Sequence, residues 1–349
     1  MMLSDEQLSE IRTSLESSSN PLFLFDNDVD GFCAFLILRR ALDRGRGVAI
    51  KSFPDLSGQY LRKLDEMGPD HVFILDKAEV SAEFIDGAVE RGVPITWIDH
   101  HESKTDPELI KKTSYYNSLP TAEPTTYLAQ KVFGRKEDLW LAMIGCIGDV
   151  YMPEFAGDFE KEFPELFSPE LAAFEALYKT EVGKLVRMLD FGLMDTITNV
   201  VSLTKYLFSA KGPYDILEEN PRIRHLHQRY NELNDFYKKQ AEKAEKGFND
   251  EDPFLVFTYS GNMSMSSQIS NLLVFNHPDK LVVVGFKRPE KVNISIRGKN
   301  ALKVTLEAIK GIEGATGGGH KSATGAMVPI DDWEKFVERV KELVESKHF

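Results

Sequence analysis

Four short and almost continuously apolar runs dominate the first third of the chain, at 21–28, 48–53, 71–77 and 93–101. The stretches between them, 31–45, 57–68 and 81–92, carry apolar residues at helical spacing, and each ends at a glycine. Strands buried on both faces read as continuous apolar runs, and strands separated by helices form βαβ units. The pattern therefore predicts an α/β fold on a parallel sheet. In such sheets, functional groups collect beyond the carboxyl ends of the strands.

The pattern of predicted secondary structure changes twice in the rest of the chain. Residues 122–215 carry mainly helical patterns, and the segment 151–171 holds six acidic residues against one lysine, which predicts an exposed acidic insertion. Asn220 and Pro221 form an N-cap followed by proline at the first helical position, and helical spacing continues to Gly247. Strand-like and helical segments then alternate again. We therefore predict an α/β domain over 1–215, a linker helix over 216–249 and a smaller α/β domain over 250–349.

Composition limits the class of protein. With 42% apolar and 28% charged residues, the 349-residue chain has the balance of a soluble globular protein. No run of eighteen or more apolar residues occurs, which argues against a membrane span. The acidic, amphipathic N-terminus does not resemble a signal peptide, and Cys33 and Cys146 lie in apolar stretches typical of buried free thiols. We expect a cytoplasmic protein. Its net charge of −13 argues against one that coats nucleic acid through its overall field.

Acidic and histidine side chains gather where the predicted strands of the first half end. They are Asp26, Asp28 and Asp30 after the first strand, Asp76 after the third, Asp99, His100 and His101 after the fourth, and Asp149 after an apolar helical run. Alternate side chains of an extended segment point the same way, so several carboxylates are expected to converge. Carboxylate oxygen with imidazole nitrogen suits Mn²⁺, Mg²⁺ or Zn²⁺. Carboxylates crowded in this way repel one another unless cations neutralise them.

Other interpretations of these residues are weaker. The Asp-rich string from Asp26 resembles the start of a calcium loop, but the twelfth position, where that loop needs glutamate, is Ile37. Asp76 or Asp149 alone is more typical of a helix cap than of a ligand. Two adjacent imidazoles at a strand end have no obvious packing role. Taken together, the set predicts a divalent metal site.

These motifs, in this order, resemble those of the DHH phosphoesterase family. The matching segments are DNDVDG from Asp26, ILDK with Asp76, IDHH with Asp99 to His101, and GCIGD with Asp149. The second half resembles the DHH-associated domain, whose glycines and histidine stand here as Gly317, Gly318, Gly319 and His320, and whose strand arginine stands here as Arg297. The resemblance covers nearly the whole chain. It implies an N-terminal parallel-sheet domain and a smaller C-terminal α/β domain joined by a long helix.

The resemblance also implies a site with two divalent ions, Mn²⁺ before Mg²⁺. The implied ligands are Asp28, Asp30, Asp76, His100 and Asp149, with Asp76 and Asp149 bridging the two ions. Asp99 would orient an imidazole, and His101 would contact the phosphate. Two such ions share a nucleophile and stabilise the leaving oxygen.

One departure from the family's motifs indicates which branch of the family the chain resembles. Pyrophosphatases and short-oligonucleotide phosphodiesterases of this family carry a histidine four residues before the first Asp of the DxD pair, and here that position is Leu24. The additional Asp26 instead resembles the RecJ-like nucleases of archaeal type. Asp26 is therefore a predicted metal ligand, with support of the loop as the alternative.

The second domain carries a local excess of basic residues. Between Lys287 and Lys321 the chain holds eight basic residues against three acidic ones, within a protein that is acidic overall. Solvated surface lysines account for some of them. Arg297 and the glycine-rich turn at Gly317 to His320 are the predicted phosphate contacts, because backbone N–H groups of such turns cradle anions. A basic strip on an acidic body directs a polyanion to one place.

The sequence thus predicts a metal-dependent phosphodiesterase, an exonuclease that hydrolyses single-stranded DNA or RNA. The resemblance further implies a role in DNA repair beside a repair or replication helicase, and no membrane partner. Two alternatives remain open: a phosphodiesterase for short oligonucleotides or cyclic dinucleotides, and a non-enzymatic replication or repair scaffold. The full set of motifs disfavours the scaffold, and the Gly-rich motif with Leu24 disfavours a pyrophosphatase.

Overall fold

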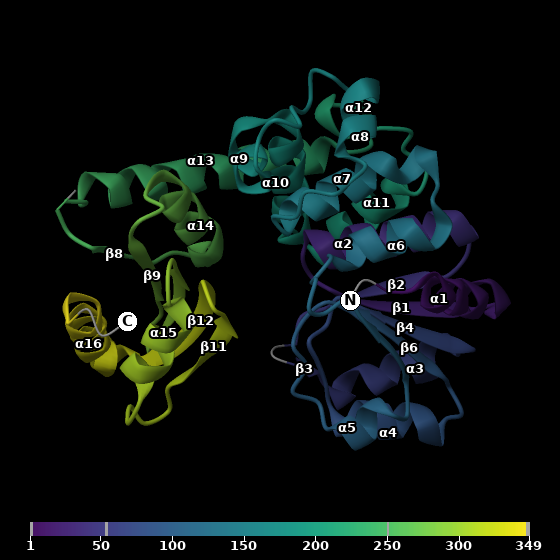
Figure 1. Cartoon of the computed structure of the whole chain (residues 1–349), viewed down its shortest axis with the longest axis horizontal. Helices are drawn as coiled ribbons and strands as arrows, with labels where there is room; N and C mark the ends of the chain where they lie inside the picture. The colour runs from purple at the N-terminus through teal and green to yellow at the C-terminus, as the bar shows by residue number, and fades with distance from the viewer. Residues whose placement is uncertain (1–2, 53–54, 250, 347–349) are drawn as a thin grey trace. The chain divides into compact units, whose positions relative to one another are not determined.

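The computed structural model describes residues 3–52, 55–249 and 251–346 (Figure 1). The chain divides into two compact units, Met1–Tyr230 and Asn231–Phe349. Within the described residues, no helix combines the length and the apolar character needed to cross a membrane. Each unit has a sheet of its own, so the predicted architecture of two α/β domains is confirmed.

The sheet of the first unit is parallel throughout, as predicted. Its strand order is β2-β1-β4-β6-β7. The strands are β1 (Pro21–Asp26), β2 (Arg46–Ile50), β4 (His71–Leu75), β6 (Ile95–Asp99) and β7 (Ser114–Asn117). A separate two-residue pair joins β3 (Asp55–Leu56) to β5 (Glu79–Val80). The sequence analysis identified the first four strands of the sheet but not the short β7 at its edge.

Helices cover both faces of this sheet (Figure 1). One face carries Leu22, Ile74 and Trp97, which pack with α3 (Leu61–Met67) and α4 (Ala82–Glu90). The other face carries Phe23 and Phe73, which pack against α1 (Asp5–Ser17), α2 (Val29–Leu42), α6 (Thr125–Phe133), α7 (Leu139–Gly148) and α10 (Glu181–Leu193). Successive side chains of a strand point to opposite faces, so burial on both faces requires the continuous apolar runs seen in the sequence. The short α5 (Pro107–Ile110) precedes β7.

The remaining helices of the first unit form an all-helical part. They are α8 (Ala156–Glu162), α9 (Ala173–Lys179), α11 (Ile197–Leu207) and α12 (Tyr214–Leu217). The expectation of an exposed acidic insertion at 151–171 is only half right. Five of its six acidic residues are exposed, but Phe159, Leu166 and Phe167 are buried in the core of the unit. The count of charges concealed an apolar side that anchors the segment.

The long helix α13 (Arg224–Lys246) begins three residues later than predicted, because Pro221 to Ile223 form a turn. Its 23 residues give a length of about 35 Å at the usual rise per residue. Its buried apolar side chains include Leu226, Leu233 and Tyr237.

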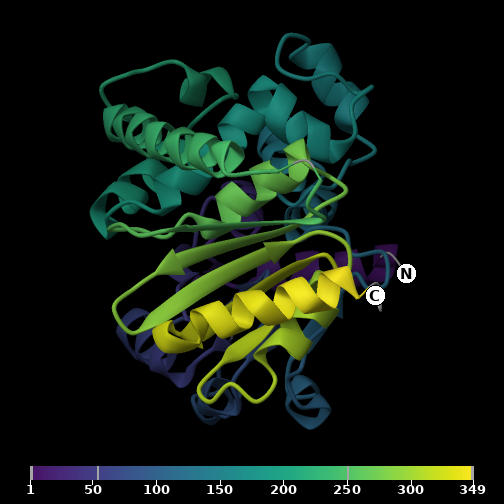
Figure 2. The same cartoon turned by 90° about the vertical axis from the view of Figure 1, so that its left-hand side faces the viewer.

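The second unit has a mixed sheet with strand order β11-β12-β10-β9-β8. Its strands are β8 (Phe254–Tyr259), β9 (Leu281–Lys287), β10 (Lys291–Arg297), β11 (Thr316–His320) and β12 (Ala323–Pro329). Only the β8–β9 pair is parallel. The helices α15 (Ala301–Ile309) and α16 (Trp333–Glu345) share one core with the sheet, and Figure 2 shows α16 lying across the strands. The helix α14 (Ser266–Asn276) packs on β9 and β10.

Candidate metal centre

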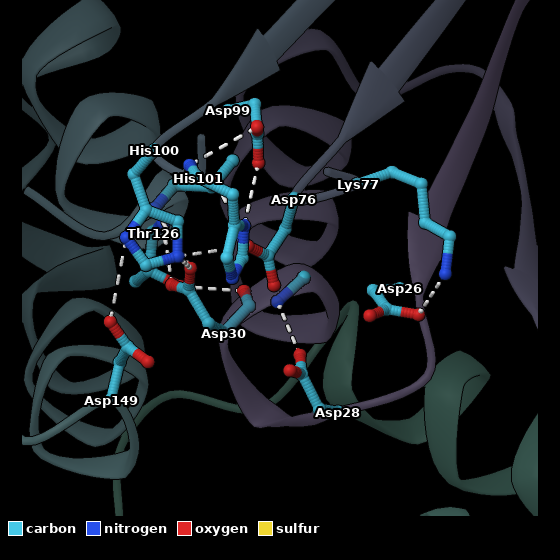
Figure 3. Close-up of polar contacts among 12 residues, drawn as sticks. Asp26, Asp28, Asp30, Asp76, Lys77, Asp99, His100, His101, Thr126 and Asp149 are labelled. Atoms are coloured by element: carbon cyan, nitrogen blue, oxygen red, sulfur yellow. Dashed lines mark hydrogen bonds and ion pairs between the residues drawn. The ribbon is translucent and has the colours of Figure 1, made fainter. Parts of the chain in front are cut away.

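Three neighbouring strands of the first unit end in acidic or histidine residues. The order β1-β4-β6 makes them adjacent, so that Asp26, Asp76 and the run Asp99 to His101 emerge at the same carboxyl edge. This is the edge where open parallel sheets carry their functional groups. Figure 3 shows His100, His101, Asp30 and Asp76 grouped there, with Asp149 reaching the group from α7.

The start of α2 supplies two further carboxylates. Asp28 is the N-cap, and its Oδ1 accepts a hydrogen bond from the backbone N–H of Gly31 at 3.0 Å. Asp30, in the first turn, is 3% exposed, and its two oxygens each accept a backbone N–H at 2.8 Å, from Thr125 and Thr126 at the start of α6. A Cβ at position 31 would lie 2.7 Å from the carbonyl oxygen of Asp26, so this close turn requires glycine.

His100 is the central side chain of the group. Its Nε2 lies 3.2 Å from Asp76 Oδ1 and 3.9 Å from Asp30 Oδ2, and its Nδ1 lies 3.7 Å from Asp149 Oδ2. One imidazole therefore contacts three carboxylates that come from α2, the end of β4 and the end of α7. Together with His101, Asp76 and His100 offer ligand atoms that all lie within 4.8 Å of one another.

Asp149 is aimed at His100 by the end of α7. Asp149 is the C-cap, and the next residue, Val150, is left-handed with φ of 57°. The backbone N–H of Val150 bonds the carbonyl of Ile147, and the backbone N–H of Tyr151 bonds the carbonyl of Cys146, which together form a Schellman ending. Glycine normally occupies the position of Val150. A β-branched residue there is strained, and such strain is found where a fold holds a functional group in place.

Asp99 and His101 form a pair beside this group. Asp99 is fully buried, its Oδ1 accepts from His101 Nδ1 at 2.9 Å, and its Oδ2 accepts from the backbone N–H of His101 at 3.1 Å. The imidazole oriented by Asp99 is therefore that of His101. His101 remains 24% exposed, which allows it to meet a ligand.

Asp26 lies apart from the contacts made by His100. Its Oδ1 is 3.2 Å from Lys77 Nζ, and Figure 3 shows the two together on the far side of Asp28. Of the six predicted metal ligands, Asp30, Asp76 and Asp149 each contact the imidazole of His100. Asp28 lies at the edge of the group, within reach of Asp76.

Sequence reasoning missed three residues of this region. The sequence assigns no role to Lys77, which follows Asp76, or to Thr125 and Thr126, whose backbone N–H groups hold Asp30. The apolar run before Asp76 gave no sign that Lys77 is buried. Asp30 and Thr125 are 95 residues apart, and no local sequence pattern indicates that the start of α6 contacts this carboxylate.

In the second unit, Arg297 is engaged by its own domain. Its Nε donates to Asn271 Oδ1, its Nη1 donates to the carbonyls of Ile296 and Thr324 at 3.0 Å, and its Nη2 donates to Ser267 Oγ at 2.8 Å. These bonds tie the end of β10 to α14 and to β12. Arg297 therefore has a structural role whether or not it also meets a phosphate.

The glycines at 317–319 differ from the predicted turn. They belong to the edge strand β11, which pairs with β12, and the turn itself is formed by Lys321 and Ser322. Gly319 has φ of 134°, and a Cβ there would lie 2.6 Å from the carbonyl oxygen of Ala323. The close hairpin thus needs glycine for its own geometry. Gly317, Gly319 and His320 are exposed.

Comparison with known proteins gives the family. Residues 22–147 match the DHH family, N-terminal domain, and residues 251–346 match the DHHA1 domain. The chain belongs to the DHH family. In the sequence, one matched segment precedes α13 and the other follows it. The first segment contains every predicted metal ligand except Asp149. No curated protein matches the sequence as a relative.

Solved structures share the fold of both DHH and DHHA1 regions at low identity. RecJ from Thermus thermophilus in complex with Mn²⁺ has a TM-score of 0.70 and 15% identity over 99% of this chain, which spans 56% of that RecJ chain. The exonuclease RecJ bound to manganese has a TM-score of 0.70 and 17% identity, over 100% of this chain and 96% of its own.

Two more distant proteins share the fold as well. CDC45 from Entamoeba histolytica has a TM-score of 0.57 and 9% identity over 99% of this chain and 100% of its own. The pGpG-specific phosphodiesterase PggH from Vibrio cholerae has a TM-score of 0.54 and 12% identity over 94% of this chain and 99% of its own.

The electrostatics of the DHH region fit a bound cation. Burial raises the pKa of Asp30, and the nearby carboxylate of Asp76 raises it further. Burial opposes protonation of His100, but its contact with Asp76 prevails and raises the pKa of His100 to about 11. The same contact lowers the pKa of Asp76 in spite of burial. In the metal-free protein a protonated His100 thus supplies the positive charge that these carboxylates require. Divalent cations prefer the same oxygen and nitrogen donors.

Proposed function

We propose that this DHH protein is a metal-dependent phosphodiesterase that acts as an exonuclease on single-stranded DNA or RNA. Family membership supports a phosphoesterase in general. The observation that carries the proposal is the imidazole of His100, which contacts the carboxylates of Asp30, Asp76 and Asp149 within 3.9 Å. Carboxylates from three separate elements gathered around one histidine serve no packing purpose, and they form a donor set for divalent cations.

The proposed cofactors are two divalent ions, Mn²⁺ before Mg²⁺, held by Asp28, Asp30, Asp76, His100 and Asp149. When bound, such ions act as Lewis acids on the phosphate and lower the pKa of water. The protein contributes fixed geometry. Thr125 and Thr126 hold both oxygens of Asp30, and the strained ending of α7 holds Asp149. Side chains fixed in this way need little reorganisation during a reaction.

His101 is the proposed contact to the substrate phosphate. Its Nδ1 donates to Asp99, which fixes the orientation of the ring, and its side chain is 24% exposed. Burial lowers the pKa of His101, but the bond to Asp99 and the charge of Asp76 outweigh burial and raise it. The imidazolium form is therefore more populated than in an unperturbed histidine, and it can stabilise negative charge on the phosphate or give a proton to the leaving oxygen.

The choice of nucleic acid as the substrate rests on chemistry in the second unit. The basic stretch from Lys287 to Lys321 contains Arg297 and the exposed His320. The fold shared with the exonuclease RecJ is consistent with this substrate. The fold shared with a pGpG-specific phosphodiesterase makes hydrolysis of short dinucleotides the second candidate. Action in the cytoplasm, beside a repair or replication helicase, forms part of the proposal.

One assay tests this proposal. Metal-stripped protein is incubated with end-labelled single-stranded DNA, single-stranded RNA and pGpG, each with Mn²⁺, Mg²⁺, Ca²⁺ or EDTA. We expect hydrolysis of a single-stranded polymer with Mn²⁺, weaker hydrolysis with Ca²⁺ and none with EDTA. The Asp149→Asn variant, purified in parallel, controls for contaminating nucleases.

The outcomes separate the candidate functions. Hydrolysis confined to pGpG would select the dinucleotide phosphodiesterase. A protein that hydrolyses none of the three substrates with any ion, while still binding single strands, would select the non-enzymatic scaffold.

A further inference from the structure

Lys77 is a buried cation immediately after Asp76 at the end of β4. Its side chain is 3% exposed, its Nζ lies 3.2 Å from Asp26 Oδ1, and the same Nζ donates to the carbonyl oxygen of Ser52 at 3.1 Å. A buried ammonium group without a partner is strongly unfavourable, and here the Asp26 carboxylate and the Ser52 carbonyl oxygen supply the partners of Lys77. Figure 3 shows that the side chain of Lys77 extends away from His100 and toward Asp26.

The contact with Lys77 fixes the position of the Asp26 carboxylate. The Oδ1 atom that meets Lys77 also accepts the backbone N–H of Asn27 at 3.0 Å. Among the described residues, His100 contacts the carboxylates of Asp30, Asp76 and Asp149, whereas Asp26 contacts Lys77. Asp26 is therefore held by a cation that is part of the chain.

Charge balance leads to the same conclusion. When Asp26 is paired with Lys77, the remaining carboxylates of the centre are Asp28, Asp30, Asp76 and Asp149. Their four negative charges equal the charge of two divalent ions with neutral His100 as a ligand.

We infer that Lys77 is a positioning residue that holds Asp26 out of the metal centre, so that divalent ions bind to the other five ligands alone. This inference rests on the metal centre of the proposed function. It departs from the sequence-based prediction that Asp26 is a ligand. Lys77 also joins the end of β4 to Ser52, in the segment after β2, and so holds together two strand ends beside the site.

The test measures metal binding by the full-length, metal-stripped protein. Mn²⁺ is titrated by calorimetry, and the ions retained per chain are counted by mass spectrometry after gel filtration. Asp26→Asn and Asp28→Asn form a matched pair, because both replace a carboxylate of the same loop by an amide. We expect Asp26→Asn to keep the parent's ion count and its Kd within about twofold, whereas Asp28→Asn should raise the Kd by roughly tenfold or more.

Two further variants test the role of Lys77 directly. Lys77→Met frees Asp26, and we expect tighter Mn²⁺ binding by roughly tenfold or one additional bound ion, since a new carboxylate joins the site. In the double variant Lys77→Met/Asp26→Asn this gain should vanish. Thermal unfolding with a single cooperative transition shows that each variant is folded.

Each outcome decides the inference. It is overturned if Asp26→Asn weakens Mn²⁺ binding as much as Asp28→Asn, or if folded Lys77→Met binds Mn²⁺ like the parent. Should Lys77→Met not fold, the comparison of Asp26→Asn with Asp28→Asn still decides. If the parent binds no Mn²⁺ at all, the proposed function fails together with this inference. If the parent binds Mn²⁺, the metal site stands, and the variants then test the role of Lys77 alone.

Discussion

In the candidate metal centre of the first unit, the imidazole of His100 lies within 4 Å of three carboxylates. In the second unit, Arg297 instead gives its hydrogen bonds to Asn271, Ser267 and two strand carbonyls. The first arrangement stores repulsion that a cation relieves. The second is complete within its own domain. Substitution of these charged residues should therefore change different properties: metal binding in the first unit and domain stability in the second.

The largest expected effect in this comparison comes from Asp149→Asn. The variant removes one ligand charge but keeps the size of a side chain that is 38% exposed, so the fold should be retained. We expect kcat to fall by about a thousandfold, equivalent to about 4 kcal/mol of lost transition-state stabilisation. Turnover is measured on a labelled single strand, with thermal unfolding of the metal-free variant as the control. Near-parental turnover with metal bound would contradict the assignment of Asp149.

The second effect is a dependence of Mn²⁺ affinity on pH. The raised pKa of His100 in the metal-free protein means that its protonated form adds stability, which is present below the ordinary value of 6.5 and is lost as the pH rises toward about 11. Binding of an ion to His100 must displace this proton. The Kd for Mn²⁺ should therefore fall by about tenfold for each pH unit between about 6 and 8. Calorimetry in buffers of different ionisation enthalpy counts the protons released, and a count of zero would exclude His100 as a ligand.

The third variant, Asp99→Asn, tests whether Asp99 orients the imidazole of His101, and it leaves the proposed metal ligands unchanged. Asp99 holds His101 through two hydrogen bonds. Losing the carboxylate should lower kcat/KM by about ten- to a hundredfold while the bound Mn²⁺ stays the same, as for residues that orient a functional imidazole. The ratio of bound metal to protein is the deciding measurement. Loss of metal from Asp99→Asn would move this residue into the ligand set.

The smallest effects on turnover are expected from the second unit. Lysine cannot reproduce the forked hydrogen bonds of Arg297, so Arg297→Lys should destabilise this unit by about 1–3 kcal/mol and lower kcat/KM on polymers by about tenfold. Arg288→Lys, at an exposed arginine immediately after β9, is the matched control and should leave stability unchanged.

His320→Ala belongs to the same comparison and should lower kcat/KM by about tenfold without loss of Mn²⁺. Parental activity of both Arg297→Lys and His320→Ala would remove the second unit from substrate binding. Loss of Mn²⁺ from His320→Ala would make His320 a ligand and break the separation between the two units.

The sequence predicted the parts of this molecule that follow from burial. The continuous apolar runs of β1, β4 and β6 reveal a two-sided sheet, and the parallel order then brings Asp76 and His100 together. The strand β7 was missed because its sequence, SYYN, is short and partly polar. The acidic segment was interpreted by its charges, which concealed Phe159 and Leu166.

Contacts between distant segments are the part that could not be predicted. The burial of Lys77 depends on Asp26 and Ser52, and Gly317 to Gly319 became a strand because β12 returns beside them. Neither fact is present in a local pattern. The strain at Val150 likewise emerges only when the end of α7 is seen, because a valine in a sequence carries no sign of its backbone angle.

The hydrogen bonds from Thr125 and Thr126 to Asp30 have a consequence for how the molecule opens. They join the first turns of α2 and α6 across 95 and 96 residues of chain, so any fluctuation that unwinds the start of α6 also exposes Asp30. The amide protons of these two threonines therefore act as built-in reporters of the site. Their exchange with deuterium should slow when Mn²⁺ is added, because a cation bound to Asp30 stabilises only the closed form. The two amides offer a view of metal binding that requires no substrate and no substitution.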